Sequence, residues 1–179
     1  MFWPSPIQKG KFLKRYKRFF ADIDVDGQVV TAHVPNTGSL KSANNPGQTC
    51  LLSLASNPER KLKYTLEAIQ APTGAWIGVN TAWPNKLVAE AFEKKIIPHW
   101  QEFDQFKPEV KISDETRLDA CLSSSKTGKK HFVEVKNVTL AQGDTAFFPD
   151  AFRSGHHRLC VESQLLYHLH GGSITHYLS

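Results

Sequence analysis

The sequence predicts an α+β protein, with a small β-barrel in residues 1–82 and a helix followed by strands in residues 83–179. Two observations support this division. Short β-prone runs separated by turn residues fill the first part, whereas a helical pattern follows Pro84 and strand-like runs return after Pro98. The chain has 179 residues, 40% of them hydrophobic, which is enough to bury one substantial core or two small ones.

Turn residues separate the strands expected in the first part. Asp26-Gly27 lies between two β-prone runs within 21–34 and predicts a hairpin, because this dipeptide favours the tight turn that joins paired strands. The other strand candidates of this part are 49–54, 64–69 and 75–80, and the turn-rich segments between them are 35–39, 44–47 and 72–74.

The N-terminal segment 9–20 is open to two interpretations. Its apolar and aromatic residues have the spacing of a helical stripe, and they also fit a long twisted strand that runs into the hairpin. Periodicity alone leaves both open.

A helix is expected after Pro84, with Asn85 as its N-cap. Apolar residues at helical spacing share one face, and Glu90 and Lys94 are placed to pair one turn apart. The apolar face consists of Leu87, Val88, Ala91, Phe92 and Ile96. Strands are then expected at 109–112, 117–122 and 131–140, and the domain boundary near residue 82.

Composition indicates a cytoplasmic protein with no membrane-spanning segment. The 22 Lys and Arg against 17 Asp and Glu give a formal charge of +5, which favours phosphate-bearing partners. The three cysteines are widely spaced and odd in number, as is typical of a reducing compartment. No apolar run is long enough to cross a membrane.

The segment 9–18 holds six cations and no acid, interleaved with aromatic residues. This mixture is typical of a surface that follows phosphates while aromatic rings stack on bases, so we expect DNA, or RNA, as the partner. A solvated strand face over a packed core is the alternative. A second stretch at 60–64 repeats the mixture. The expected nucleic-acid contacts are Lys11, Lys14, Arg15, Tyr16, Lys17 and Arg18, with Arg60, Lys61 and Lys63 from the second stretch.

Two carboxylates in the second half are expected to converge. If 123–130 forms a hairpin loop centred between Lys126 and Thr127, opposite positions sum to 253 and Asp119 faces Glu134. On one strand Glu134 and Lys136 would share a face, because side chains alternate.

Two carboxylates repel each other unless a cation lies between them, and Mg²⁺ prefers one or two carboxylates with several retained waters. Asp119, Glu134 and Lys136 are therefore candidates for metal-dependent attack on a phosphodiester, in which the lysine positions water and stabilises charge. A surface Glu-Lys ion pair is the alternative.

Several stretches together resemble the sugar fermentation stimulation protein (SfsA) family. They occur in collinear order over residues 3–152, and the most specific are VEVKNVTL and the downstream FPDA. Others include PSPIQKGKFLKRYKRFFADI, AHVPNTGSL and GVNTAWPNKLVAEAF.

The resemblance implies an OB-like barrel followed by an α/β domain of the PD-(D/E)xK nuclease fold, and with it a strand at 9–20. It implies sequence-non-specific DNA binding with a regulatory role in sugar (maltose) metabolism, or alternatively Mg²⁺-dependent nuclease activity. Asp119, Glu134 and Lys136 fall on the nuclease motif, and Glu90 falls where a helix can present a further metal-binding acid.

The resemblance ends near residue 152. The remainder, FRSGHHRLCVESQLLYHLHGGSITHYLS, follows no family pattern and holds five of the eight histidines. We interpret it as a frameshifted or truncated ending, so that the nuclease-like domain is expected to lack its last covering elements.

Overall fold

The computed structural model describes residues 6–142, 145–147, 166–170 and 173–177. These residues belong to two compact units, which we treat separately. The barrel unit contains the residues up to Thr81 together with those from Asn137 onward, and the helix-and-sheet unit contains Ala82–Lys136. The FPDA segment and much of the sequence after residue 152, including His156 and His157, lie outside the described residues.

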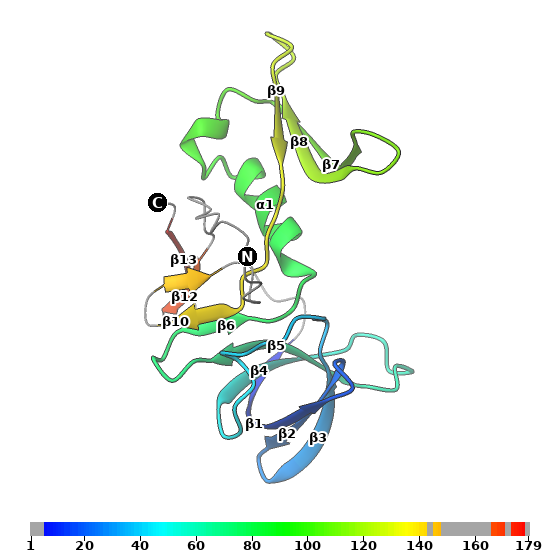
Figure 1. The fold of residues 1–179 in the computed structure, drawn as a ribbon, viewed down its shortest axis with the longest axis vertical. Coiled ribbons are helices and arrows are strands. Elements are labelled where there is room, and N and C mark those ends of the chain that lie inside the picture. The colour runs from blue at the N-terminus through cyan, green and yellow to red at the C-terminus, as the bar shows by residue number, and fades with distance from the viewer. Residues whose placement is uncertain (1–5, 143–144, 148–165, 171–172, 178–179) are drawn as a thin grey trace, which may run out of the picture. The chain divides into compact units, whose positions relative to one another are not determined.

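The barrel unit contains a six-stranded sheet in the order β3-β2-β1-β4-β5-β6. Parallel pairing of β3 with β5 closes the first five strands into the barrel seen in Figure 1. The small barrel expected from the sequence is thus confirmed. Its strands are β1 (Ile7–Tyr16), β2 (Phe20–Val25), β3 (Gln28–His33), β4 (Thr49–Leu54) and β5 (Tyr64–Gln70), with β6 (Trp76–Gly78) added at one side.

The N-terminal segment is a strand, β1, in agreement with the implication of the family resemblance. Its first half pairs with β4 and its second half with β2, and a bulge at Leu13 separates the two stretches of β1–β2 pairing. Gly10 and Phe12 are buried, while Lys9 before them and Lys11 between them are exposed, which is the period-two alternation of a half-buried strand. The spacing of the apolar residues also fitted a helix because of this bulge, since the extra residue shifts the alternation of buried and exposed positions by one.

Asp26 and Gly27 form the predicted turn between β2 and β3. Both have positive φ, at 52° and 84°, as a type I′ turn requires. The Gly27 N–H donates to the Asp24 carboxylate at 2.8 Å, which further stabilises the turn.

The barrel core draws apolar side chains from all of its strands. The largest fully buried ones include Phe12 of β1, Ile23 of β2, Leu52 of β4 and Leu66 of β5. Burial raises the pKa of the Cys50 thiol on β4 to about 12, so this thiol is uncharged and unreactive at neutral pH.

The helix-and-sheet unit consists of helix α1, a short 3-10 turn and a three-stranded antiparallel sheet in the order β7-β8-β9. Leu87, Val88 and Ala91 are the buried residues of α1, and Phe92 packs on Phe106 of β7 with ring centroids 5.4 Å apart. The elements are α1 (Trp83–Glu93), η1 (Pro98–Trp100), β7 (Gln105–Lys111), β8 (Arg117–Ser123) and β9 (Lys130–Val133).

Both ends of the helix differ from the prediction. The N-cap is Ala82, without a side-chain cap, and Asn85 lies inside the first turn, where its amide donates to Asp119. The helix ends at Glu93, so Ile96 lies beyond it and is 39% exposed. Proline is well tolerated in the first turn of a helix, so Pro84 does not prevent a start before Asn85.

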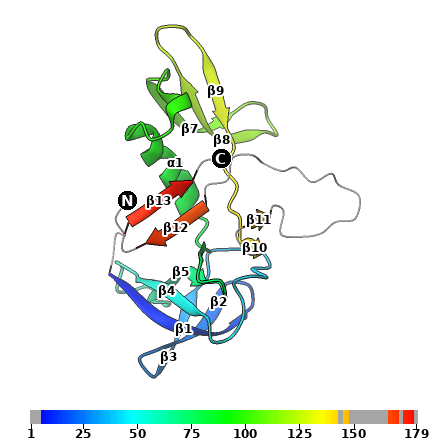
Figure 2. The same ribbon diagram turned by 90° about the vertical axis from the view of Figure 1, so that its left-hand side faces the viewer.

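The strand expected at 131–140 is shorter than predicted. β9 ends at Val133, and a segment without regular structure follows it, as Figure 2 shows. Just beyond this strand, the Asp119 carboxylate accepts the Val135 N–H at 2.7 Å, so a side chain of β8 bonds the segment that follows β9. Two short hairpins follow, β10 (Leu140–Gln142) with β11 (Thr145–Phe147) and β12 (Leu166–His170) with β13 (Ser173–Tyr177).

Among the residues that the structure describes, no helix has the length and apolar character needed to span a membrane.

Candidate functional site

The cations of β1 lie mainly on its outer surface. Lys9 and Lys11 are exposed, and Lys11 Nζ donates to the Thr49 hydroxyl on the neighbouring strand at 3.2 Å. Lys14 is 69% exposed and pairs with Asp22 at 3.4 Å. The first two lysines thus present positive charge to solvent, whereas the charge of Lys14 is partly balanced by an acid.

The Asp22 carboxylate on β2 interacts with three donor side chains. Desolvation by partial burial alone would raise the pKa of this carboxyl group. Hydrogen bonds from Thr31 (3.0 Å) and Tyr16 (3.1 Å), together with Lys14, outweigh that effect and lower its pKa, so the carboxylate is charged at neutral pH.

Tyr16 was expected to stack on bases, but one face of its ring is already occupied. The ring stacks on Phe20 with centroids 5.7 Å apart and an interplanar angle of 14°, and Lys14 Nζ lies 5.8 Å from its centroid. Its hydroxyl is engaged by Asp22. Tyr16 therefore supports the start of β2, which limits the ring surface open to a base.

Arg15, unlike the exposed lysines of β1, is bonded to the main chain of the barrel. Its guanidinium donates to three main-chain carbonyls, those of Arg18 (2.7 Å), Gly38 (2.7 Å) and Asn36 (2.6 Å). Partial burial, and secondarily the nearby charge of Arg18, lower the pKa of Arg15. This side chain joins the β1–β2 turn to the loop after β3.

The second basic stretch lies at the end of the loop between β4 and β5. Lys61 and Lys63 are exposed, while Arg60 is half-buried and donates to the Thr65 hydroxyl at 3.0 Å. The pKa of His33 is lowered by burial and by the positive charge of Arg60, so His33 is mainly neutral at pH 7.

Barrel closure brings the two basic stretches together at the end of β3. His33 pairs with Phe20, which follows the β1–β2 turn, and also with Thr65, which follows the β4–β5 loop. Neighbouring strands are about 4.8 Å apart, so these two loops end about 10 Å from each other. In the OB fold, the loops between strands 1 and 2 and between strands 4 and 5 are the ones that contact oligonucleotides.

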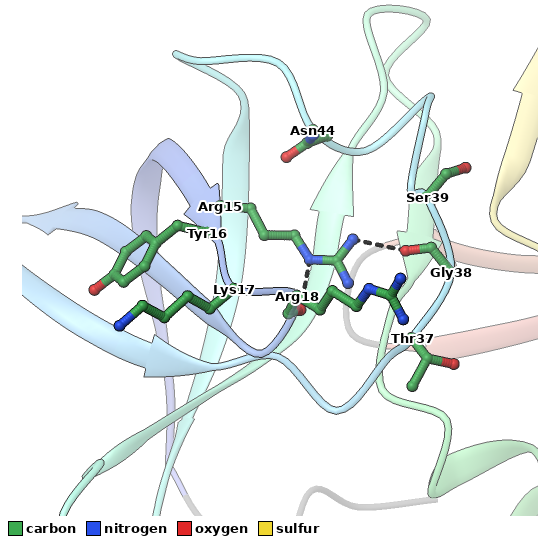
Figure 3. Close-up of a pocket in the computed structure, with 8 residues that line it drawn as sticks. All are labelled: Arg15, Tyr16, Lys17, Arg18, Thr37, Gly38, Ser39 and Asn44. Carbon is green, nitrogen blue, oxygen red and sulfur yellow. Dashed lines mark hydrogen bonds between the residues drawn. The ribbon is translucent and has the colours of Figure 1, made fainter.

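A pocket of about 440 Å³ opens beside the β1–β2 turn (Figure 3). The sequence identified the basic part of its lining but missed the part that comes from the loops after β3, because those segments showed only turn residues. The lining residues are Arg15, Tyr16, Lys17, Arg18, Thr37, Gly38, Ser39 and Asn44.

In the helix-and-sheet unit, the predicted hairpin register is confirmed. Ala120 pairs with Val133 and Leu122 with His131, so opposite positions sum to 253 as expected, and the same register extended by one residue would place Asp119 opposite Glu134. Asp119 lies on β8, and Glu134 follows directly after the last residue of β9.

Each of the three predicted catalytic residues forms a hydrogen bond or an ion pair. The Asp119 carboxylate accepts from the Asn85 amide at 3.1 Å and from the Val135 N–H at 2.7 Å. Lys136 forms an ion pair with Glu134, and both side chains are more than 40% exposed. The sequence had not identified Asn85 as a partner of this carboxylate, since the contact joins residues far apart along the chain.

Glu90 is paired with Lys94, the C-cap residue of α1. Its carboxylate accepts from Lys94, and this hydrogen bond lowers its pKa. Within the described part of the chain, no three His, Cys, Asp or Glu side chains form a group that could hold a metal ion. The structure therefore places Asp119 and Glu134 at the end of the β8–β9 pairing but does not bring Glu90 into a three-acid group with them.

Two family models match this chain. The SfsA N-terminal OB domain matches residues 13–79, and the sugar fermentation stimulation protein RE domain matches residues 82–157.

Individual proteins agree with these matches. A sugar fermentation stimulation protein homolog of Bdellovibrio bacteriovorus is 63% identical over 156 residues, which cover 82% of this chain and 64% of that protein. A homolog of Synechocystis is 40% identical over 96% of this chain and 77% of the relative. The chain thus spans less than two thirds of the Bdellovibrio protein's length.

Among solved structures, SfsA of Pyrococcus furiosus in complex with Ca²⁺ superposes with a TM-score of 0.70. It is 27% identical in sequence, and the match covers 84% of this chain and 62% of the other.

Proposed function

The chain belongs to the sugar fermentation stimulation protein (SfsA) family, and we propose from this that it binds DNA through its barrel without regard to base sequence. The observation that carries the proposal is the approach of two basic loops on either side of His33. Arg18 and Lys17 come from one loop, and Lys61 and Lys63 from the other.

The charge arrangement favours contacts to phosphate. Lysine and arginine on loops reach phosphate oxygens, which are the same in every sequence, so such contacts supply affinity without specificity. Lys9 and Lys11 extend the positive surface along β1. A regulatory role in sugar metabolism would act through binding of this kind to chromosomal DNA.

The test is binding of labelled DNA, with RNA of the same sequence alongside, to the full chain and to charge variants. Lys17→Gln and Lys61→Gln, one from each loop, are each expected to weaken DNA binding severalfold, because each removes one phosphate contact. Lys107→Gln, on exposed β7 of the other unit, is the matched control and is expected to bind as the unaltered chain does. Equal affinity of all three variants would contradict the proposal.

Metal-dependent cleavage of a phosphodiester is a second candidate, favoured by the register that aligns Asp119 with Glu134. Both offer carboxylate oxygens, the ligands that hard divalent cations prefer, and Mg²⁺ needs only one or two of them beside its waters. These residues therefore fit a divalent cation, and the solved SfsA relative is a complex with Ca²⁺.

In this second candidate, Asp119 and Glu134 would hold the ion and Lys136 would act beside it. The bound ion would polarise the phosphate and its attacking water. The Asn85 amide and the Val135 N–H, both bonded to Asp119, would fix the orientation of that carboxylate. Lys136, released from its pairing with Glu134 once the ion is bound, would position the water and stabilise charge on the phosphate.

Cleavage is tested by incubating supercoiled DNA with the full chain in Mg²⁺, in Ca²⁺ and in a chelator. Lys136→Ala is expected to lose Mg²⁺-dependent cleavage while keeping DNA affinity, and Lys107→Ala is expected to keep both. Cleavage that persists in Lys136→Ala, or that is independent of added metal, would exclude this mechanism.

A further inference from the structure

The pocket beside the β1–β2 turn has an unusual backbone. Lys17 and Arg18 both adopt the left-handed conformation, with φ of 47° and 63°. Short turns normally place glycine or asparagine at such positions, because other side chains are strained there. Two cationic side chains are thus held in a strained turn, and strain of this kind is concentrated at functional sites.

The Arg18 side chain faces the pocket. Figure 3 shows it extending toward Thr37, whereas Lys17 and Tyr16 extend away on the other side of the turn. Arg18 is exposed, and among the described residues its guanidinium has no hydrogen bond or ion pair. Its five donor N–H groups are therefore available to a ligand.

Arg15 forms hydrogen bonds with the main-chain carbonyl oxygens that would otherwise repel an anion. The carbonyls of the lining residues Arg18 and Gly38, and that of Asn36 next to Thr37, all accept from the Arg15 guanidinium and so are directed toward it. The lining residues Thr37 and Asn44 add a hydroxyl and an amide, both of which can donate. The accessible lining is thereby rich in donors.

The positive charge of the pocket lining favours an anion as its ligand. The lining includes no acid, and its cations are Arg15, Arg18 and Lys17, the last of which extends away from the pocket. The charge of Arg18 adds to burial in lowering the pKa of Arg15, which shows that the two guanidinium groups are close enough to repel each other. A bound anion would relieve this repulsion.

We propose that this pocket binds one phosphate group, with Arg18 as the principal ligand and Thr37 and Asn44 as further donors. Arginine suits phosphate because its planar N–H groups match two phosphate oxygens at once. The pocket, at about 440 Å³, also has room for the sugar to which a phosphate is attached. The inference rests on the proposed function in expecting a phosphate of a DNA strand as the occupant.

The experiment is a titration of the isotope-labelled full chain, observed through the backbone amides of Thr37, Gly38 and Ser39. Inorganic phosphate is the first probe, and it is expected to shift these amides with saturation. Arg18→Gln is expected to weaken phosphate binding at least about tenfold, the loss typical of one charge-assisted hydrogen-bonded contact. Lys107→Gln removes the same charge elsewhere and is expected to bind phosphate unchanged.

Two results would overturn the inference. One is a phosphate response that fails to saturate and is spread over amides throughout the chain. The other is unchanged phosphate affinity in Arg18→Gln, provided that the rest of its spectrum matches the unaltered chain and so shows an intact fold.

Thymidine monophosphate and a short single-stranded DNA distinguish the sources of the phosphate. DNA that shifts the same amides and displaces inorganic phosphate supports a strand phosphate. Saturation by the mononucleotide, with these amides unmoved by DNA, supports a phosphate site for a small ligand.

The same titrations separate this inference from the proposed function. DNA binding that leaves the pocket amides unmoved, combined with no response to phosphate, would overturn the pocket and leave DNA binding intact. Saturation by phosphate in a chain that binds no DNA would support the phosphate pocket and overturn the proposed DNA binding.

Discussion

The Arg15 guanidinium donates to carbonyls from two loops of the barrel, those of Arg18 in the β1–β2 turn and of Asn36 and Gly38 after β3. Lysine carries the same charge but cannot form this fork, because its three N–H donors all lie on one nitrogen. At the scale of single residues, Arg15 thus differs from Lys9 and Lys11, which are on the same strand and exposed.

Arg15→Lys is expected to destabilise the barrel by about 2 kcal/mol, since partly buried carbonyls lose charge-assisted partners. Urea unfolding measures the free energy of unfolding, and amide hydrogen exchange in β1 and β4 measures the local stability of these strands. Arg18→Lys is the control at a neighbouring exposed position, and it is expected to change stability by less than about 0.5 kcal/mol. Equal stability of the two variants would contradict the structural role assigned to Arg15.

At the scale of elements, β1 depends on a close approach that only glycine permits. A Cβ atom added at Gly10 would lie 2.6 Å from Ile23 Cγ2 and 2.9 Å from the Asp24 carbonyl oxygen on β2. The second of these atoms belongs to the backbone, so β1 and β2 would have to separate.

Gly10→Ala is therefore expected to destabilise the barrel by about 1–3 kcal/mol, the usual range for overpacking. Gly78→Ala in β6 is the matched control, because a Cβ there meets nothing within 4 Å. Thermal unfolding of both variants provides the measurement. A Gly10→Ala variant as stable as Gly78→Ala would show that β2 can shift without cost.

The point at which β9 ends determines the surroundings of two predicted catalytic residues. The pairing of β8 with β9 ends at Ala120 and Val133, and beyond it the Asp119 side chain accepts the Val135 N–H. As a result Glu134 and Lys136 lie just beyond the strand, where both are partly exposed.

At the scale of the whole molecule, whose formal charge is +5, DNA binding through phosphate contacts is expected to depend on salt concentration. If about four phosphates are neutralised, the logarithm of affinity for duplex DNA falls with the logarithm of salt concentration with a slope of roughly −3.6. Titration of labelled duplex between low and physiological salt measures this slope. A flat response would exclude binding through phosphate contacts.

The sequence by itself determined the features that depend on neighbours along the chain. Asp26-Gly27 predicted its turn because only a few residues tolerate two consecutive positive φ angles. The apolar run at 49–54 predicted β4, and the hairpin loop predicted the register of β8 and β9, because pairing across a short loop follows from its centre.

Only the tertiary structure decided what distant residues do together. The turn of Lys17 and Arg18 and the loop of Lys61 and Lys63 lie near each other because β3 pairs with both β2 and β5, and no local pattern encodes that closure. Arg15 was indistinguishable from its basic neighbours in sequence, and its role became visible through carbonyls more than twenty residues away. Local order follows from backbone preference and side-chain alternation, whereas the chemistry of a surface depends on contacts that form only when the barrel closes.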